Sequence, residues 1–227
     1  MKIGILGTGI VGQAHAVKLG LLGHDVVMGT KNVLQKLASA NTEDAEHKAF
    51  SDWLKQQKNI SLRTLEEASE QGVLVFNALR GEAALAIISP LAKQLSGKVL
   101  VDIANPLDFS KGMPPSLFVA STDSLAEQLQ RALPDTKVVK AFNTVTARLQ
   151  TDPGLLAHGD HHLFICGNDA SAKSVVADIA RSYSWENIID LGDITNARGM
   201  EMIMPFWLEL WGALKSPMFN YKIVTGK

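Results

Sequence analysis

The chain has 227 residues, of which 46% are hydrophobic and 20% are charged, and its formal net charge is −1. This composition is typical of a soluble globular protein with one large domain or one and a half small ones. The near-zero charge excludes a general electrostatic attraction to nucleic acid or membranes. The one cysteine, Cys166, excludes an intramolecular disulfide and favours a reducing compartment, so we expect a cytoplasmic protein.

The sequence predicts neither a signal peptide nor a membrane span. The N-terminus enters a glycine turn at residue 7, too soon for the apolar core of a signal peptide. The most apolar stretch, 200–214, is interrupted by Glu201, Pro205 and Glu209 and is too short to cross a bilayer.

Short apolar runs alternate with helical periodicities over the first 143 residues. Strands are predicted at 2–7, 25–29, 60–63, 73–78, 98–105 and 137–143, and helices at 10–23, 44–57, 64–71, 82–95 and 124–133. The last of these helices opens with a capping box, Ser124 and Glu127. This alternation predicts an α/β fold with a doubly wound, Rossmann-type parallel sheet. Ligands of such sheets bind at the carboxyl ends of the strands.

The pattern changes after about residue 144. Strands are predicted at 161–168 and 187–192, with a helix at 169–183 between them, and a last helix runs from Thr195 to about Leu214. We therefore expect an NADP-binding Rossmann domain at 1–143 and a smaller α/β extension at 144–227. The last helix carries Met202, Trp207, Leu210 and Trp211 on more than one face. Because a small domain cannot easily cover all of them, we predict a homodimer that uses this helix.

The segment "GTGIVG" (7–12) is a dinucleotide-binding motif. Gly7 permits the tight turn out of the first strand, Gly9 lets the backbone approach a pyrophosphate, and Gly12 permits close packing of helix on strand. The backbone amides near Ile10 and Val11 face the phosphates at the helix N-terminus. A lone motif of this kind is a weak signal, but this one follows an apolar strand, precedes a helix and begins a series of βα units.

The end of the second strand indicates which dinucleotide is bound. An NAD-binding chain is expected to carry an acidic residue there, about 20 residues after the glycines. This chain has Thr30 and Lys31 instead, and Asp25 lies at the wrong end of the strand. A hydroxyl and a positive charge suit a 2′-phosphate, and Lys36 adds charge one helical turn later. The sequence therefore favours NADP over NAD.

Several longer segments carry a family resemblance. "MKIGILGTGIVG", "GHDVVMGTKN", "LVFNALRG", "VDIANPL", "VVKAFNTV", "FICGND" and "GDITNARGMEMIMPFWLELW" resemble, in the same order, the F420-dependent NADP oxidoreductases. The chain is also similar to the oxidoreductase domain of the STEAP metalloreductases, in which "VKAFNT" is recognisable. The resemblance implies hydride transfer between NADPH and a deazaflavin, coenzyme F420, or a flavin. Archaeal members carry a histidine near the Asn143 position, whereas asparagine is typical of the STEAP-like branch, so both acceptors stay open.

The family pattern implies a set of cofactor-binding positions. Pyrophosphate contacts fall at Gly7, Thr8, Gly9, Ile10, Val11 and Gly12, the 2′-phosphate contacts at Thr30 and Lys31, and the nicotinamide-ribose loop at Asn77, Ala78, Leu79 and Arg80. The nicotinamide is flanked by Ala104, Asn105 and Pro106, and approached from the sixth strand by Ala141, Phe142 and Asn143.

Hydride transfer between stacked rings requires positioning rather than acid–base chemistry. The predicted strand ends offer no Cys nucleophile and no Ser-His-Asp set, so no catalytic residue is assigned; the chemistry is expected near Asn105 and Asn143. A reductase of carbonyls would need a general acid. The alternatives are a non-catalytic NADP(H)-binding redox sensor and a reductase of small carbonyls or imines.

Other polar clusters have simpler interpretations. His158, Asp160, His161 and His162 are possible metal ligands, but neighbouring residues on a strand point to opposite faces, so we predict no metal site. His15 is interpreted as a packed or exposed helix residue rather than a catalytic one, and Cys166 as a buried, inert thiol.

Overall fold

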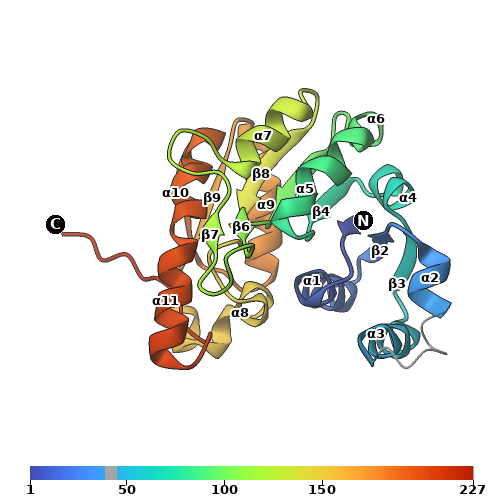
Figure 1. The fold of residues 1–227 in the computed structure, drawn as a ribbon, viewed down its shortest axis with the longest axis horizontal. Coiled ribbons are helices and arrows are strands. Elements are labelled where there is room, and N and C mark those ends of the chain that lie inside the picture. The colour runs from blue at the N-terminus through green and yellow to red at the C-terminus, as the bar shows by residue number, and fades with distance from the viewer. Residues whose placement is uncertain (39–44, 227) are drawn as a thin grey trace.

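The protein is described here by a computed structural model that covers residues 1–38 and 45–226 (Figure 1). The strands are β1 Lys2–Leu6, β2 Asp25–Thr30, β3 Ile60–Thr64, β4 Leu74–Asn77, β5 Val99–Asp102, β6 Leu107–Asp108, β7 Ser116–Leu117, β8 Lys137–Ala141, β9 His162–Gly167 and β10 Asn187–Asp190. The helices are α1 Ile10–Leu21, α2 Val33–Ala38, α3 Ala45–Lys55, α4 Leu65–Gln71, α5 Gly81–Ile88, α6 Ala92–Leu95, α7 Leu125–Ala132, α8 Ala147–Thr151, α9 Ala170–Ser182, α10 Ala197–Met202 and α11 Met204–Leu214. Part of the predicted helix at 44–57 falls on residue 44, outside the described residues.

The main sheet has the order β10-β9-β8-β5-β4-β1-β2-β3, with a separate two-stranded ribbon β6-β7. Strands β1, β2, β3, β4, β5 and β8 are mutually parallel. The order reverses between β1 and β4, which is where a Rossmann fold binds its ligand. The expected Rossmann-type fold is confirmed. Among the described residues, no helix is long and apolar enough to cross a membrane.

Strands β9 and β10 depart from the expected parallel sheet, because β9 is antiparallel to β8 and β10 is parallel to β9. A parallel neighbour requires a crossover that carries the chain back to the opposite edge of the sheet. After β8 the chain instead forms the five-residue helix α8 and short turns, and then enters β9 from the edge at which β8 ended. Strands β9 and β10 therefore continue the main sheet, and the division of the chain at residue 143 stays a prediction.

Alternate strand residues pack on opposite faces of the sheet. Ile3 and Ile5 belong to an apolar cluster with α1, α3, α8 and α9, whereas Leu6 belongs to a second cluster with α4, α5, α6, α7 and α10. Successive residues of a strand point to opposite faces of the sheet, and helices cover both faces here. The strands therefore need apolar side chains on both faces.

Prolines divide two of the predicted helices. The helix expected at 82–95 is interrupted by a 3₁₀ turn that contains Pro90, and the last helix is split at Ile203, with Pro205 in the first turn of α11. Proline has no N–H to donate and fits only the first turn of a helix. α11 packs on the C-terminal segment, because Trp207 is buried and stacks on Phe219 at 5.1 Å between ring centroids. Trp207 is therefore not free for a dimer contact.

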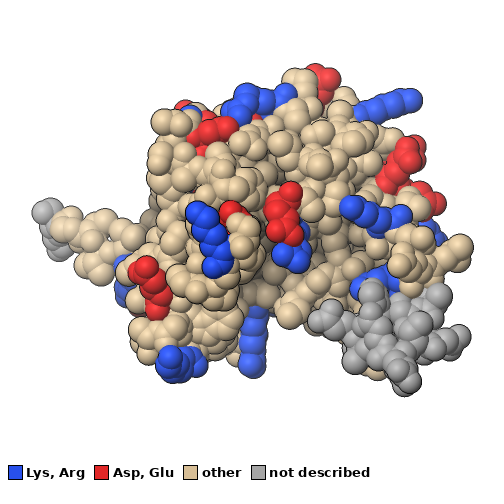
Figure 2. Space-filling view, viewed as in Figure 1, with Lys and Arg blue, Asp and Glu red and all other residues tan. Residues whose placement is uncertain are grey.

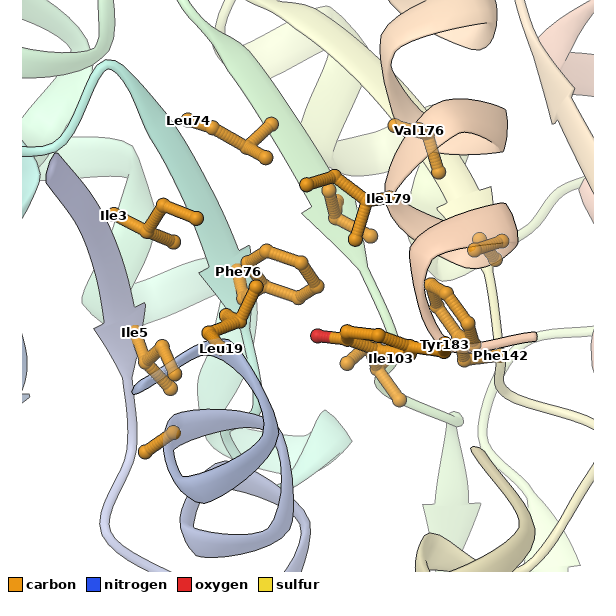
Figure 3. Close-up of a cluster of buried hydrophobic side chains, with 14 of the residues drawn as sticks. Ile3, Ile5, Leu19, Leu74, Phe76, Ile103, Phe142, Val176, Ile179 and Tyr183 are labelled. Carbon is orange, nitrogen blue, oxygen red and sulfur yellow. The ribbon is translucent and has the colours of Figure 1, made fainter. Parts of the chain in front are cut away.

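His15 joins α1 to α8 and α9 within the first cluster. Its ring lies 3.2 Å from the Tyr183 hydroxyl through Nδ1 and 2.9 Å from the Gln150 amide oxygen through Nε2, and the side chain is completely buried. Figure 3 shows the Tyr183 hydroxyl pointing from α9 toward α1, beside Phe76. Burial lowers the pKa of His15 from its ordinary value of 6.5 to about 4, against the opposing effect of the Gln150 hydrogen bond. Of the two interpretations left open for His15, packed or exposed, the structure shows the packed one.

This pKa shift predicts a loss of stability in mild acid. A lowered folded pKa means that the unfolded chain binds the proton more readily, so the contribution of His15 is complete above pH 6.5 and is lost as the pH falls toward 4. We expect the free energy of unfolding to fall by about 2 kcal/mol from this residue between pH 7.5 and pH 5. Urea denaturation at both pH values measures it. A His15→Gln variant that retains the same pH dependence would contradict the assignment.

Candidate functional site

The glycine turn between β1 and α1 has the geometry of a phosphate-binding loop. Gly7 has φ +120°, a conformation that side chains rarely adopt, and a Cβ on it would lie 2.6 Å from the carbonyl oxygen of Ala78. A Cβ on Gly12 would lie 2.6 Å from the carbonyl oxygen of Gly7. A Cβ on Gly9 would meet nothing within 4 Å, although Gly9 is the residue that opens α1. Gly7 and Gly12 are thus required by the fold itself, whereas the space beside Gly9 is open to a ligand.

A cavity of about 210 Å³ lies next to this turn at the carboxyl edge of β4 and β5. It is lined by Val11, Ala78, Leu79, Arg80, Gly81, Glu82, Ile103, Ala104, Asn105, Leu107 and Phe109. Most of these side chains are apolar. The two charged ones, Arg80 and Glu82, pair with each other at 2.9 Å and are largely exposed. The cavity therefore offers an apolar slot beside an anion-binding helix N-terminus.

The structure brings together many of the predicted site residues. Val11, Ala78, Leu79, Arg80, Ala104 and Asn105 all line the cavity, and Thr8, Gly9 and Ile10 lie at the turn beside it. Asn77 and Pro106 are buried behind the lining. The Asn77 side chain faces inward, accepting from the Leu79 amide and donating to Asp102, so it supports the loop rather than facing the cavity.

Ala141, Phe142 and Asn143 do not line the cavity. All three are buried, and Phe142 has φ +63°, a strained backbone for a non-glycine residue. The Gln150 side chain donates to the Phe142 carbonyl at 2.9 Å and holds this turn. Asn143 meets the cavity wall indirectly, because its amide nitrogen donates to Asn105 Oδ1 and Asn105 donates in return to the Asn143 carbonyl, both at 2.9 Å.

Thr30 and Lys31 lie at the carboxyl end of β2, where Lys31 is exposed. Sequence analysis missed a second cation there: β3 pairs with β2 so that Arg63 lies opposite Gly29, and its exposed side chain donates through Nη1 to the Leu62 carbonyl at 2.9 Å. Lys36 is turned elsewhere, with its ammonium 4.9 Å from the Phe50 ring centre. The strand end thus presents a hydroxyl and two cations in a short span. Strand pairing, which sequence alone does not give, is the signal that locates Arg63.

Two of the three histidines in segment 158–162 bond to other groups of the protein. His161 is buried, with Nε2 3.0 Å from the Pro153 carbonyl and Nδ1 2.8 Å from the Asn220 amide nitrogen, and His162 Nδ1 accepts from the Ile223 amide. In the part of the chain that is described, no group of three His, Cys, Asp or Glu side chains could hold a metal ion.

Comparison with known proteins identifies the family. Residues 2–106 match the family described as NADP oxidoreductase, coenzyme F420-dependent. The F420-dependent NADP reductase of Methanocaldococcus jannaschii is 33% identical over 92% of both chains. The chain belongs to the F420-dependent NADP reductase family.

Two further relatives are similar to this chain over nearly its whole length. A crystal structure of a candidate F420-dependent NADP reductase from Arthrobacter sp. FB24 superposes with a TM-score of 0.93, at 48% identity, over 99% of this chain and 100% of that one. Rat metalloreductase STEAP3 is 31% identical over 91% of this chain, which spans only 38% of that protein. The predicted resemblance is confirmed, and the chain is an NADP-dependent oxidoreductase of the F420-dependent family.

The F420-dependent reductase fold of this chain contains a buried ionic cluster that sequence analysis missed. Lys140 on β8 lies 2.8 Å from Asp102 on β5 and 2.8 Å from Glu201 on α10, and these side chains are at most 1% exposed. A signal was present, because Asp102 ends an otherwise apolar strand and Lys140 lies within the run Val138–Ala141, and the two residues are opposite each other in register. Gly81 was also missed: a Cβ on it would come within 1.8 Å of the Asn105 carbonyl oxygen, so only glycine fits there.

Proposed function

We propose that the protein transfers hydride from NADPH to coenzyme F420, with a flavin as the alternative ring acceptor. The observation that carries this proposal is the apolar cavity beside the glycine turn, bounded by Ala78 and Ala104. Of the residues that line it, only Arg80 and Glu82 ionise, and they neutralise each other at its mouth. Such a site suits a flat ring stacked on the nicotinamide better than a carbonyl, which needs a proton donor.

The residues of the chain fit NADPH along the carboxyl edge of the sheet. Thr30, Lys31 and Arg63 would hold the 2′-phosphate, and the N-terminus of α1 would face the pyrophosphate across the open space at Gly9. The nicotinamide would then enter the cavity at Ala104. This assignment uses the whole edge from β3 to β5 and leaves Phe109 exposed at the rim as a surface for the acceptor ring.

The chemistry is a two-electron transfer. NADPH supplies a hydride from C4 of the nicotinamide, the acceptor ring takes it together with a proton from water, and NADP⁺ remains. The contribution of the chain is to bring the two rings into contact and exclude water, since proximity and orientation dominate such a step. Small side chains at Ala78 and Ala104 leave the space that the second ring requires.

Anaerobic NADPH oxidation, followed by absorbance with coenzyme F420, FMN, FAD and a panel of carbonyls and imines in turn, tests this proposal. We expect turnover with coenzyme F420, and turnover with flavins alone would select the flavin acceptor. Reduction of a carbonyl or imine without any flavin would assign the chain to the dehydrogenase or imine-reductase class. Tight NADPH binding without turnover of any of them would leave a redox sensor as the function.

The preference for NADPH over NADH is tested by removing the lysine at the end of β2. Lys31→Ala should weaken NADPH binding by about 1–3 kcal/mol, the range for a hydrogen bond to a charged group, and should leave NADH binding nearly unchanged. Fluorescence titration with each nucleotide measures this. Lys58→Ala, which removes an exposed lysine elsewhere, is the matched control. NADH binding as tight as that of NADPH in the unmodified protein would disprove the preference.

We also propose that a second copy of the chain covers α11. Phe206, Trp211 and Leu214 on this helix are 52%, 42% and 57% exposed, and the C-terminal segment leaves the body of the molecule beside it (Figure 1). Ile223 and Val224 near the end of that segment are exposed as well. An apolar helix face continued by an apolar arm suits a two-fold contact between identical chains.

A dimer of this kind should be visible by light scattering at micromolar concentration. Trp211→Glu, which places a charge in the proposed contact, is expected to raise the dissociation constant by about tenfold or more. Glu209→Gln, an exposed change on the same helix, is the control. A monomeric mass for the unmodified protein would refute the proposal.

We also propose a cytoplasmic location for the protein. The sole cysteine, Cys166, is buried, and burial raises the pKa of its thiol to about 12, so it is an inert packed residue rather than a disulfide partner.

The face in Figure 2 carries scattered charges of both signs instead of a basic patch, which suits a small-molecule substrate.

A further inference from the structure

Three ionisable side chains form a closed cluster beneath the cavity. The Lys140 ammonium bonds to Asp102 Oδ2 and to Glu201 Oε1, both at 2.8 Å, and also donates to the Ala104 carbonyl. Lys140 and Asp102 have no exposed surface, and Glu201 has 1%. These groups come from the paired strands β5 and β8 and from α10, which are far apart in the sequence.

The cluster holds both loops that wall the cavity. The backbone of Ala104 is fixed on both sides of its Cα, because its N–H donates to Asp102 Oδ1 at 3.2 Å and its carbonyl accepts from Lys140. The same Asp102 oxygen accepts from Asn77 Nδ2 at 2.7 Å, and Asn77 Oδ1 accepts from the Leu79 amide at 3.2 Å. One carboxylate therefore sets the spacing between the Ala78–Leu79 wall and the Ala104 wall.

The other end of the cluster is tied to the helices behind the cavity. Glu201 accepts from the Leu125 and Ala126 amides at the start of α7, at 2.8 and 3.2 Å. One residue before it, the Met200 carbonyl accepts from Asn143, which bonds to Asn105 in the cavity wall. α7, α10 and the end of β8 thus provide a fixed frame for Asn105 as well.

Stability alone does not account for ionised groups in this place. A buried ion pair costs desolvation that its attraction barely repays, and apolar packing of the same volume is often as stable. Two carboxylates face a single ammonium here, and burial together with the Asp102 charge raises the pKa of Glu201 despite Lys140. What the cluster supplies beyond packing is fixed geometry, since each of its groups has a defined partner.

We propose that Asp102, Lys140 and Glu201 are positioning residues that set the width of the nicotinamide cavity for hydride transfer. This inference rests on the proposed function, since it concerns the cavity assigned to the nicotinamide. None of the three touches the reacting atoms; they act through the Ala104 and Leu79 backbones. Their loss should impair the transfer step more than it impairs nucleotide binding, because the 2′-phosphate and pyrophosphate contacts lie elsewhere.

The test is a neutral cluster of similar shape, Asp102→Asn, Lys140→Met and Glu201→Gln together, which leaves no unpaired buried charge. We expect 2′,5′-ADP, which carries the 2′-phosphate but no nicotinamide, to bind within about twofold of the unmodified protein, while kcat falls about 100-fold, the scale of an ångström-sized misplacement. The nicotinamide fluorescence of bound NADPH should become less polarised, because the loosened walls let the ring move.

Arg198→Met is the matched control. It removes a half-buried ion pair with Glu127, 2.6 Å long, that joins the same helices α10 and α7 away from the cavity. It should lower the unfolding temperature and leave kcat and the fluorescence polarisation unchanged. If the triple variant fails to fold, Asp102→Asn alone keeps the Lys140–Glu201 pair and should reduce kcat about tenfold.

A neutral-cluster variant with kcat within about threefold of the unmodified protein and unchanged polarisation of bound NADPH would overturn the positioning role. The two proposals fail separately. An unmodified protein that binds NADPH but reduces no acceptor contradicts the proposed function, and the polarisation of bound NADPH still decides whether the cluster fixes the ring.

Discussion

Replacing Gly9 with valine is expected to abolish NADPH binding while leaving the fold intact. Gly9 has φ −76° and ψ −178°, a backbone that any residue adopts, and a Cβ there meets no protein atom within 4 Å. The side chain would instead fill the space that we assign to the pyrophosphate. We expect affinity to fall more than about 100-fold, which corresponds to about 3 kcal/mol or more. Fluorescence titration with NADPH and thermal unfolding of the free protein measure the two quantities.

Gly12 provides the opposite case within the same motif. A Cβ at residue 12 would lie 2.6 Å from the Gly7 carbonyl oxygen, so Gly12→Ala should destabilise the free protein by about 1–3 kcal/mol through overpacking. If Gly9→Val bound NADPH as the unmodified protein does, the pyrophosphate would have to lie away from the α1 N-terminus. Loss of fold in Gly9→Val would mean that the open space is needed by the chain itself.

Replacing Ala104 with leucine should block hydride transfer. Ala104 lines the cavity and is 5% exposed. Its backbone N–H is held by Asp102 on the side away from the cavity, so a larger side chain can extend only into the cavity. The cavity holds only about 210 Å³, and a leucine side chain would occupy much of the room that a second ring needs. We expect kcat/KM for the acceptor to fall about 100-fold or more, since misplacement on an ångström scale already costs that much.

Nucleotide binding should change much less in the same variant, because the adenine half of NADPH would be held at Thr30, Lys31 and the α1 N-terminus. Steady-state kinetics with the best acceptor and titration with NADPH separate the two effects. Ala86→Leu, an exposed change on α5, is the control. An Ala104→Leu enzyme with undiminished kcat/KM would show that the acceptor binds somewhere other than this cavity.

The sequence predicted the fold because its signals are local. Apolar runs that end at glycine or at polar strand ends marked β1, β2, β4, β5 and β8, and the "GTGIVG" turn marked where the nucleotide would lie. The capping box expected at Ser124 is half formed: Ser124 accepts from the Glu127 amide, but the Glu127 carboxylate accepts from the Ser124 hydroxyl and from Arg198. Local pattern gave the position of the cap, and a distant residue decided its partner.

The candidate site was less predictable because its supports are long-range. Asp102 and Lys140 are 38 positions apart and meet only because β5 and β8 pair in register, and Glu201 joins them from α10. Gly81 and Arg63 depend in the same way on which strands are neighbours. The antiparallel entry of β9 could not be predicted from its apolar pattern, since a short apolar run indicates a buried strand without giving its direction.

Isotope transfer tests the central claim most directly. NADPH carrying deuterium at C4 of the nicotinamide, on each face in turn, is reacted with coenzyme F420 in ordinary water. The proposed reaction forms a carbon–hydrogen bond on the deazaflavin ring, so deuterium from one face only should be recovered in the reduced acceptor and not in the solvent. Deuterium released to water, or retained in NADPH with the acceptor unreduced, would contradict direct hydride transfer by this protein.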